Sequence, residues 1–151
     1  MLEINNLTTT KIDENFLKEI AKIVLKGEKK EGNISLALIG PNRMRKLNKK
    51  YRGKNRVTDV LAFEEKGLVP QSWSQELQKV QGLGEIVICL REVKKNSKRL
   101  NEPFEKELAR VFLHGILHLL GYDHEKSEEE SKKMKEKEEK YLKEIVKLGN
   151  E

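Results

Sequence analysis

Cysteine is almost absent from this sequence, since Cys89 is the only one in 151 residues. A single thiol cannot form an internal disulfide, so a reducing cytoplasm is the expected location. Long apolar runs are also missing, because no stretch approaches the roughly 18 uncharged residues that a membrane span needs. Residues 1–10 carry neither the basic nor the apolar region of a signal peptide. These absences argue against disulfide scaffolds and membrane-spanning proteins.

Aromatic residues make up only 5% of the chain and hydrophobic residues 36%, whereas 37% are charged. The apolar residues nevertheless recur with helix and strand periods, which is not typical of a disordered chain. The sequence contains no internal repeat and no linker rich in proline, glycine or serine. Because a domain of about 100–150 residues can bury a core of its own, we expect one domain spanning residues 1–151.

Strands and helices are predicted to alternate along the chain. Short runs of branched apolar residues predict strands at 2–7, 33–39, 57–63 and 85–90. Helical spacing predicts helices at 13–27, 42–51, 91–100, 103–120 and 127–148, with Asp13 as a cap, Pro103 as a first helical residue, and Met44, Leu47 and Tyr51 facing inward. Residues 64–82, which include Trp73, are predicted to form a loop. The expected fold class is α+β (α/β-like), with a small, mainly parallel sheet of about four strands packed with about five helices.

Positive charge is concentrated in the first part of the chain. The net charge is +6, yet residues 41–56 hold eight lysines and arginines and no acid. A dense patch of one sign repels itself, which favours an anionic partner such as RNA over an ordinary solvated helix face. Residues 125–140 instead mix both signs, which is typical of a solvated helix. We therefore assign that helix no function.

The three histidines of the chain all lie in the segment HGILHLLGYDH, as His114, His118 and His124. Positions i and i+4 share one face of a helix. Gly121 is expected to end the helix, so that the chain turns back and brings His124 to the same place. Three imidazoles and an open fourth position are typical of a catalytic zinc site. This spacing favours a metal site at the end of the long buried helix over three hydrogen-bonded core histidines.

The same spacing occurs in the metzincin proteases, which need a glutamate after the first histidine as general base. Gly115 stands at that position here and cannot move a proton, so peptide hydrolysis by that mechanism is not expected. Glu107 lies about two helical turns away and is a poor substitute. Asp123 is expected to serve in a turn or to support a ligand. The sequence does not decide between water and an RNA 2′-hydroxyl as nucleophile.

The segment HGILHLLGYDH resembles the signature H-G-x-L-H-L-x-G-Y-D-H of the YbeY family of bacterial endoribonucleases, also called rRNA maturation factors. The resemblance extends to Tyr51-Arg52-Gly53, to the run Thr58 to Leu61, and to the segment Gly84 to Ile88. Ala62, Glu65 and Glu85 stand where the family has serine, proline and aspartate. The resemblance thus covers most of the chain.

The resemblance implies a zinc-dependent endoribonuclease that is specific for single-stranded RNA and acts in 16S rRNA 3′-end maturation and ribosome quality control. His114, His118 and His124 carry over as metal ligands, and Arg52 as the functional arginine. From the basic segment we predict RNA contacts at Arg43, Arg45, Lys46, Lys49, Lys50 and Arg56. Two other classes stay open: a non-enzymatic rRNA-binding assembly factor with a structural metal, and a metal-dependent hydrolase of another substrate.

Overall fold

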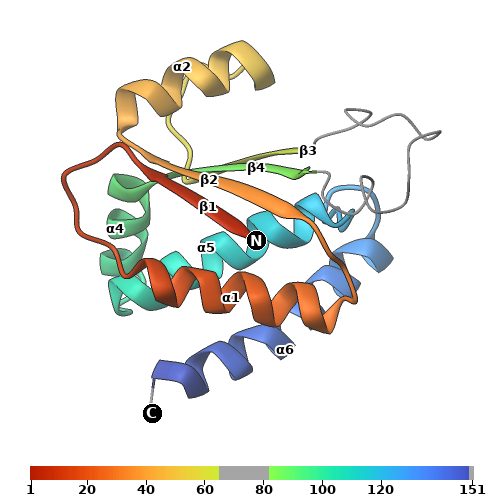
Figure 1. The fold of residues 1–151 in the computed structure, drawn as a ribbon. Helices are drawn as coiled ribbons and strands as arrows, with labels where there is room; N and C mark the ends of the chain where they lie inside the picture. The colour runs from red at the N-terminus through yellow and green to blue at the C-terminus, as the bar shows by residue number, and fades with distance from the viewer. Residues whose placement is uncertain (65–81, 150–151) are drawn as a thin grey trace.

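A four-stranded mixed sheet forms the centre of the molecule (Figure 1). The computed structural model describes residues 1–64 and 82–149. The sheet has the order β1-β2-β4-β3, in which β1 and β4 pair in parallel with β2 and β3 runs antiparallel beside β4. The strands are β1 (Leu2–Asn6), β2 (Asn33–Ile39), β3 (Val60–Glu64) and β4 (Gly82–Cys89). The expected small, mainly parallel sheet is confirmed.

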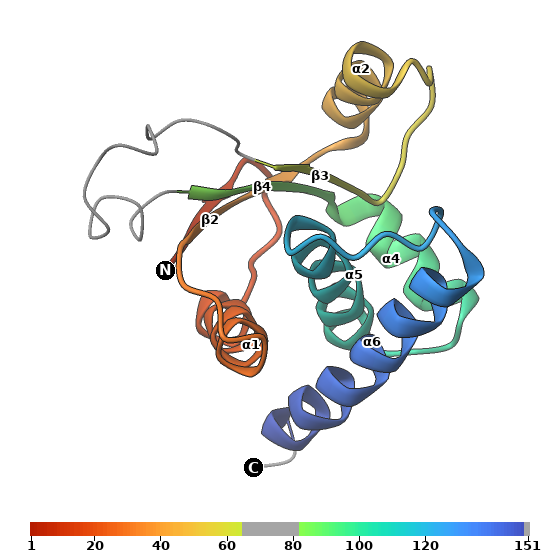
Figure 2. The same ribbon diagram turned by 90° about the vertical axis from the view of Figure 1, so that its right-hand side faces the viewer.

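Helices cover both faces of the sheet, but unequally (Figures 1 and 2). One face carries α1 (Glu14–Gly27), α4 (Leu90–Arg99), α5 (Phe104–Leu119) and α6 (Glu128–Gly149). Among the described helices, only α2 (Pro41–Arg52) lies on the other face. The larger hydrophobic core lies between the sheet and the four helices. A small second core beneath α2 contains Ile39, Met44, Leu61, Val87 and Cys89.

Alternation along the strands explains this division. Ile34, Leu36 and Leu38 of β2 are buried in the larger core, while Ala37 and Ile39 belong to the core beneath α2. Because successive side chains point to opposite faces of a sheet, an apolar residue at nearly every position requires cover on both sides. The sequence NISLALI therefore specifies a strand buried on both faces.

Helix ends match the predictions in part. Asp13 caps α1, its side chain accepting a hydrogen bond from the amide of Phe16 at 3.2 Å. Pro103 is the N-cap of α5 rather than its first helical residue, since the helix begins at Phe104. Tyr51 is 52% exposed, which corrects its expected inward position, because its ring lies edge-on against Phe63 at the surface.

The bounds of β3 and β4 differ from the predicted ones by up to three residues, and β1 ends one residue before the predicted end. β3 begins at Val60 rather than residue 57, because residues 53–59 form the irregular connection from α2 to the sheet. β4 begins at Gly82 rather than residue 85 and ends at Cys89, after which α4 starts at once. Of the loop predicted at residues 64–82, Glu64 belongs to β3 and Gly82 to β4, and residues 65–81, which include Trp73, lie outside the described residues.

Gly27 is the last residue of α1, but it is not the left-handed residue that terminates the helix. The left-handed residue that terminates α1 is Lys29, with φ 55°, and not a glycine. The amides of Lys29 and Lys30 bond back to the carbonyls of Lys26 and Leu25, as in a Schellman motif. A Cβ on Gly27 would lie within 3 Å of the Tyr141 ring, so glycine is required there for the approach of α6.

Glu28, directly after α1, joins three distant parts of the chain. Its carboxylate accepts hydrogen bonds from the hydroxyls of Tyr122 and Tyr141 and from the ammonium of Lys137 at 3.1 Å. Burial raises the pKa of Glu28, but these three hydrogen bonds together bring the pKa below its usual value. Burial and the neighbouring Glu28 raise the pKa of Tyr122 to about 12, so its hydroxyl stays a donor.

The described helices include none with the length and apolar composition of a membrane span.

We predict that Glu28→Gln destabilises the fold in a pH-dependent way. Because the folded-state pKa of Glu28 is lowered, its ionised form contributes stability above the unfolded-state pKa of about 4.3, and this stability is lost as the pH falls through the folded-state value. The variant should lose about 1.5–3 kcal/mol of unfolding free energy at pH 7. Urea denaturation from pH 7 to pH 3 measures the difference, which should shrink on acidification. Glu19→Gln, on the exposed face of α1, is the control.

Candidate metal centre

Helix α5 positions the first two histidines. Nearly every side chain around them is buried, including those of Val111, Phe112 and Leu113. His114 and His118 are half-buried and lie one turn apart on the same face. In the second half of α5 the other side chains are buried. The face that carries His114 and His118 is the polar one, so both imidazoles point in the same direction.

The turn after α5 brings in the third histidine. The amide of Gly121 donates to the His118 carbonyl and the amide of Tyr122 to the Leu117 carbonyl, both at 3.1 Å. This pair of bonds is a Schellman motif, and Gly121 occupies its left-handed position with φ 100°. The hydroxyl of Tyr122 then donates to Glu28 at 2.5 Å, which fixes the loop beside His124.

The three imidazoles converge as the spacing predicts. Their ring centroids lie 5.1 Å apart for His114 and His118, and 5.3 and 5.4 Å from each of these to His124. One ring nitrogen from each lies within 4.8 Å of the other two, so the group can hold a metal ion. Burial and the neighbouring imidazoles lower the pKa of His118, which favours the neutral form that binds metals.

A cleft of about 600 Å³ opens over the histidines. One wall comes from α5 and the loop after it, and includes Asp123. The opposite wall comes from the end of α2, the connection that follows it, and β3, and includes Arg52 and Asp59. Residues that are some sixty positions apart in the sequence therefore face one another across a single cleft.

Comparison with known proteins agrees with this geometry. The profile of the family described as "Endoribonuclease YbeY" matches residues 3–146. The chain belongs to the YbeY family. The endoribonuclease YbeY of Thermotoga maritima is 38% identical over 136 residues, covering 90% of this chain and 82% of the relative. That of Petrotoga mobilis is 36% identical over 145 residues, covering 95% and 94%.

A solved structure supports the same assignment. A Thermotoga maritima protein whose structure was determined in solution superposes with a TM-score of 0.67 at 33% sequence identity. The match covers 99% of this chain and 92% of the other. The α+β fold expected from the alternation of strands and helices is thus confirmed over nearly the whole chain.

Arg52 reaches the cleft from the last turn of α2. Its guanidinium donates to the Ala62 carbonyl at 2.9 Å and lies over the Phe63 ring, 5.3 Å from the ring centroid. Both contacts are with β3, so they hold the side chain at the sheet edge. A guanidinium has five N–H donors, and one bond to Ala62 leaves others for a ligand.

Three acidic residues near the histidines are already engaged in hydrogen bonds. Both oxygens of the buried Glu107 accept hydrogen bonds from Arg110, at 2.8 and 2.6 Å. Asp123 accepts the amide of Glu125 at 2.9 Å, a local turn interaction. Asp59 contacts the side chains of Asn96 and Thr58 at 3.4 and 3.5 Å.

Gly115 faces the sheet, where a Cβ would lie 3.0 Å from Ile86, so a larger residue there would press against β4.

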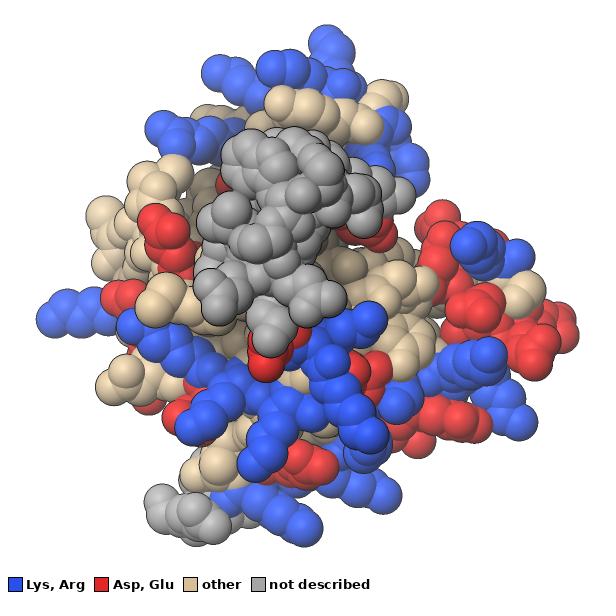
Figure 3. Space-filling model, turned by 45° about the vertical axis from the view of Figure 1, so that its right-hand side comes forward, with Lys and Arg blue, Asp and Glu red and all other residues tan. Residues whose placement is uncertain are grey.

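Six further bases were predicted to bind RNA, and all six are exposed. Of these only Arg56 lines the cleft. The others lie on α2, which carries a blue surface at the top of the space-filling view (Figure 3). This surface stands on the opposite face of the sheet from the histidines, and the cleft opens where the two faces meet at the β3 edge. The five are Arg43, Arg45, Lys46, Lys49 and Lys50.

Glu138 is the site residue that the sequence did not reveal. It extends from α6, and its carboxylate lies 2.5 Å from the Nδ1 of His114. The contact occupies one ring nitrogen and leaves Nε2 for a ligand. A carboxylate behind a metal-binding imidazole fixes the ring and raises its basicity. The helix that was expected to be only solvated therefore supports the site.

We predict that Glu138→Ala weakens binding of added Zn²⁺ by about 10–100-fold, the usual effect of losing such a partner. The Nδ1 of His114 would lose its acceptor, and the ring its fixed orientation. Competition against a chromophoric chelator measures the affinity. Glu139→Ala, at an exposed neighbouring position, should bind Zn²⁺ as the parent does. Equal affinities of the two variants would remove Glu138 from the site.

Proposed function

We propose that this chain is a zinc-dependent endoribonuclease specific for single-stranded RNA. It acts in the cytoplasm in rRNA processing, including 16S rRNA 3′-end maturation, and in ribosome quality control. The observation that carries the proposal is the cluster of three histidines facing Arg52 across one cleft, in a chain that belongs to the YbeY family. The lone buried Cys89 is consistent with a reducing compartment.

His114, His118 and His124 would hold the zinc ion. Their donor set suits it, because imidazole is a common zinc ligand and a catalytic site keeps its fourth position open. When bound, zinc supplies Lewis-acid chemistry that makes hydroxide available near neutral pH. A structural zinc site would usually have four protein ligands, and the only cysteine is buried in β4, away from the cluster. This favours an enzyme over an assembly factor with a structural metal.

Arg52 would bind the phosphate that is cleaved. A guanidinium matches two phosphate oxygens with paired donors and stays charged at every physiological pH. The contacts of Arg52 with Ala62 and Phe63 support this role, because they restrain the side chain before RNA binds. Its charge would then stabilise the negative charge that develops on the phosphoryl group.

The exposed bases of α2 would hold RNA away from the reacting bond. Arg43, Arg45, Lys46, Lys49 and Lys50 have no acid among them in the helix, so they offer phosphate contacts without repulsion. Arg56 would continue these contacts into the cleft. RNA would thus cross from α2 over the β3 edge to the histidines. An extended single strand can follow this path around the sheet edge more easily than a stiff duplex.

We predict that His118→Ala removes both the metal and RNA cleavage. Elemental analysis of the purified protein should find about one zinc per chain before the change and far less after it. Metal-loaded parent protein should cleave a single-stranded RNA and leave a duplex of the same sequence intact. Loss of the ion should also lower the melting temperature, because binding stabilises the folded state. Metal content that is unchanged by the substitution would contradict the ligand set.

Substitution of Arg52 should separate turnover from binding. We expect Arg52→Ala to lower the single-turnover rate by about 10²–10³-fold, which is the scale of losing one preorganised donor. RNA affinity should fall much less, because other bases remain on α2 and in the cleft. Arg52→Lys should restore only part of the rate, since it lacks paired donors. Near-normal cleavage by Arg52→Ala at saturating protein would assign Arg52 to binding alone.

RNA binding through α2 should depend strongly on salt. Each phosphate contact contributes about −0.7 to the slope of log affinity against log salt for a single strand. Replacing Lys46, Lys49 and Lys50 together with alanine should flatten the slope by about 2 and leave the zinc content unchanged. Fluorescence anisotropy from 50 to 300 mM salt measures the slope. A slope that does not change would place the RNA elsewhere.

A further inference from the structure

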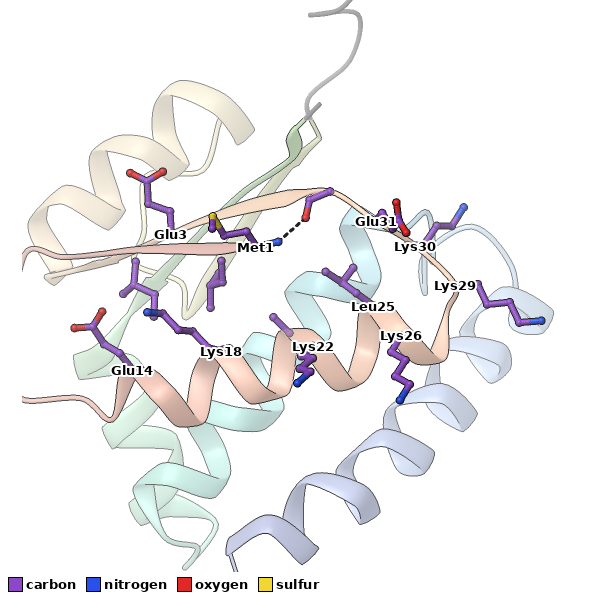
Figure 4. Close-up of a pocket in the computed structure, with 14 residues that line it drawn as sticks. Met1, Glu3, Glu14, Lys18, Lys22, Leu25, Lys26, Lys29, Lys30 and Glu31 are labelled. Carbon is purple, nitrogen blue, oxygen red and sulfur yellow. Dashed lines mark hydrogen bonds between the residues drawn. The ribbon is translucent and has the colours of Figure 1, made fainter. Parts of the chain in front are cut away.

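A groove of about 1450 Å³ lies at the edge of the sheet opposite to the histidine cleft (Figure 4). It runs between β1 and α1 and is closed at one end by residues 29–32, where the amino group of Met1 donates to the Gly32 carbonyl at 2.9 Å. None of the residues that line it lines the cleft over the histidines. The groove is therefore a separate feature, for which the cleavage reaction provides no use.

One wall of the groove is an unpaired strand edge. β1 is the outer strand of the sheet and pairs only with β2 among the described residues. The carbonyl of Met1 and the amide of Leu7 both form hydrogen bonds with β2. Because the backbone N–H and C=O groups of successive residues in a strand point to opposite sides, those of residues 2 and 4 point away from β2. Leu2 and Ile4 therefore direct their backbone N–H and C=O groups outward along the groove. Such an edge is a template for another strand.

The floor of the groove is apolar. Leu2, Ala21 and Leu25 are buried there, and Ile4 is half-buried. A second strand laid against β1 would place every other side chain over these residues. The floor therefore suits an extended peptide with alternating apolar side chains.

Lysines line the groove along α1 and the turn that follows it. Lys18, Lys22 and Lys26 repeat every fourth residue along α1, and Lys29 and Lys30 follow in the turn (Figure 4). All five are exposed, and none has an ion-pair partner among the described residues. Positive charge that is not neutralised within the protein favours an acidic ligand.

We propose that this groove binds an extended acidic segment of a partner protein, which adds as a strand to the free edge of β1. Main-chain hydrogen bonds to Leu2 and Ile4 give affinity, the apolar floor accepts alternate side chains, and the lysines select for acidic residues between them. RNA fits less well, because the unpaired strand edge and the apolar floor offer no contacts to a phosphate backbone, whereas a peptide strand uses both. Because the two sites lie at opposite sheet edges, partner and RNA can bind together.

A defined peptide tests the proposal on the whole protein. The probe is the octapeptide (Glu-Val)₄, acetylated and amidated, titrated into ¹⁵N-labelled protein while amide resonances are recorded. The largest shifts should fall on Leu2 and Ile4, whose amides face the groove, and on α1. The double variant Lys22→Glu/Lys26→Glu should bind at least tenfold more weakly. The matched control Lys94→Glu/Lys98→Glu, on the exposed face of α4, should bind as the parent does.

Three further probes give the other outcomes. (Lys-Val)₄ has the opposite charge and (Glu-Pro)₄ cannot form a strand, so neither should shift these resonances. The absence of shifts at Leu2 and Ile4 with millimolar (Glu-Val)₄, or equal shifts with either control peptide, would overturn the proposal. An oligouridylate that shifts β1 and α1 would assign the groove to nucleic acid instead. If the α1 variant does not give a folded spectrum, Lys18→Glu/Lys30→Glu replaces it, with the same expectation.

Discussion

The burial of α5 is the constraint on which the rest of the structure depends. The sheet covers one side of this helix, and α1, α4 and α6 cover others (Figure 2). A helix held in this way cannot rotate without exposing apolar residues such as Phe112 and Ile116. The direction of His114 and His118 is therefore set by the hydrophobic core and not by the metal. This helix supplies two of the three nitrogens, and its terminating turn supplies the third.

The sheet separates two surfaces that differ in packing and charge. The face beneath α2 has a small core and a basic exterior, whereas the other face has the larger core and the histidines. They meet at β3, where the backbone carbonyl of Ala62 holds Arg52. A short antiparallel strand at this edge leaves the cleft open to solvent. The opposite edge, β1, lies beside lysines and belongs neither to the α2 surface nor to the histidine cleft.

Much of this could be read from the sequence because it depends on local patterns. The spacing of His114, His118 and Gly121 encodes the site within one helix and one turn. Glu138 could not be found in that way, because it is one glutamate among many in a charged helix, and only tertiary packing selects it. Tyr51 was placed wrongly for the same reason. Helical period assigned it to the core, but the small core beneath α2 does not extend to the end of the helix.

The hydrogen bonds of Glu28 have a consequence for the order in which the structure is completed. Glu28 and Tyr141 lie 113 residues apart, and Glu28 and Tyr122 lie 94 apart. The contacts of Glu28 with Tyr141 and Lys137, and that of His114 with Glu138, can form only after α6 has left the ribosome and docked, because all three partners lie on this helix. The surroundings of the histidines are therefore completed only when the last helix has docked. An unfinished chain beside the ribosome lacks the carboxylate that contacts His114.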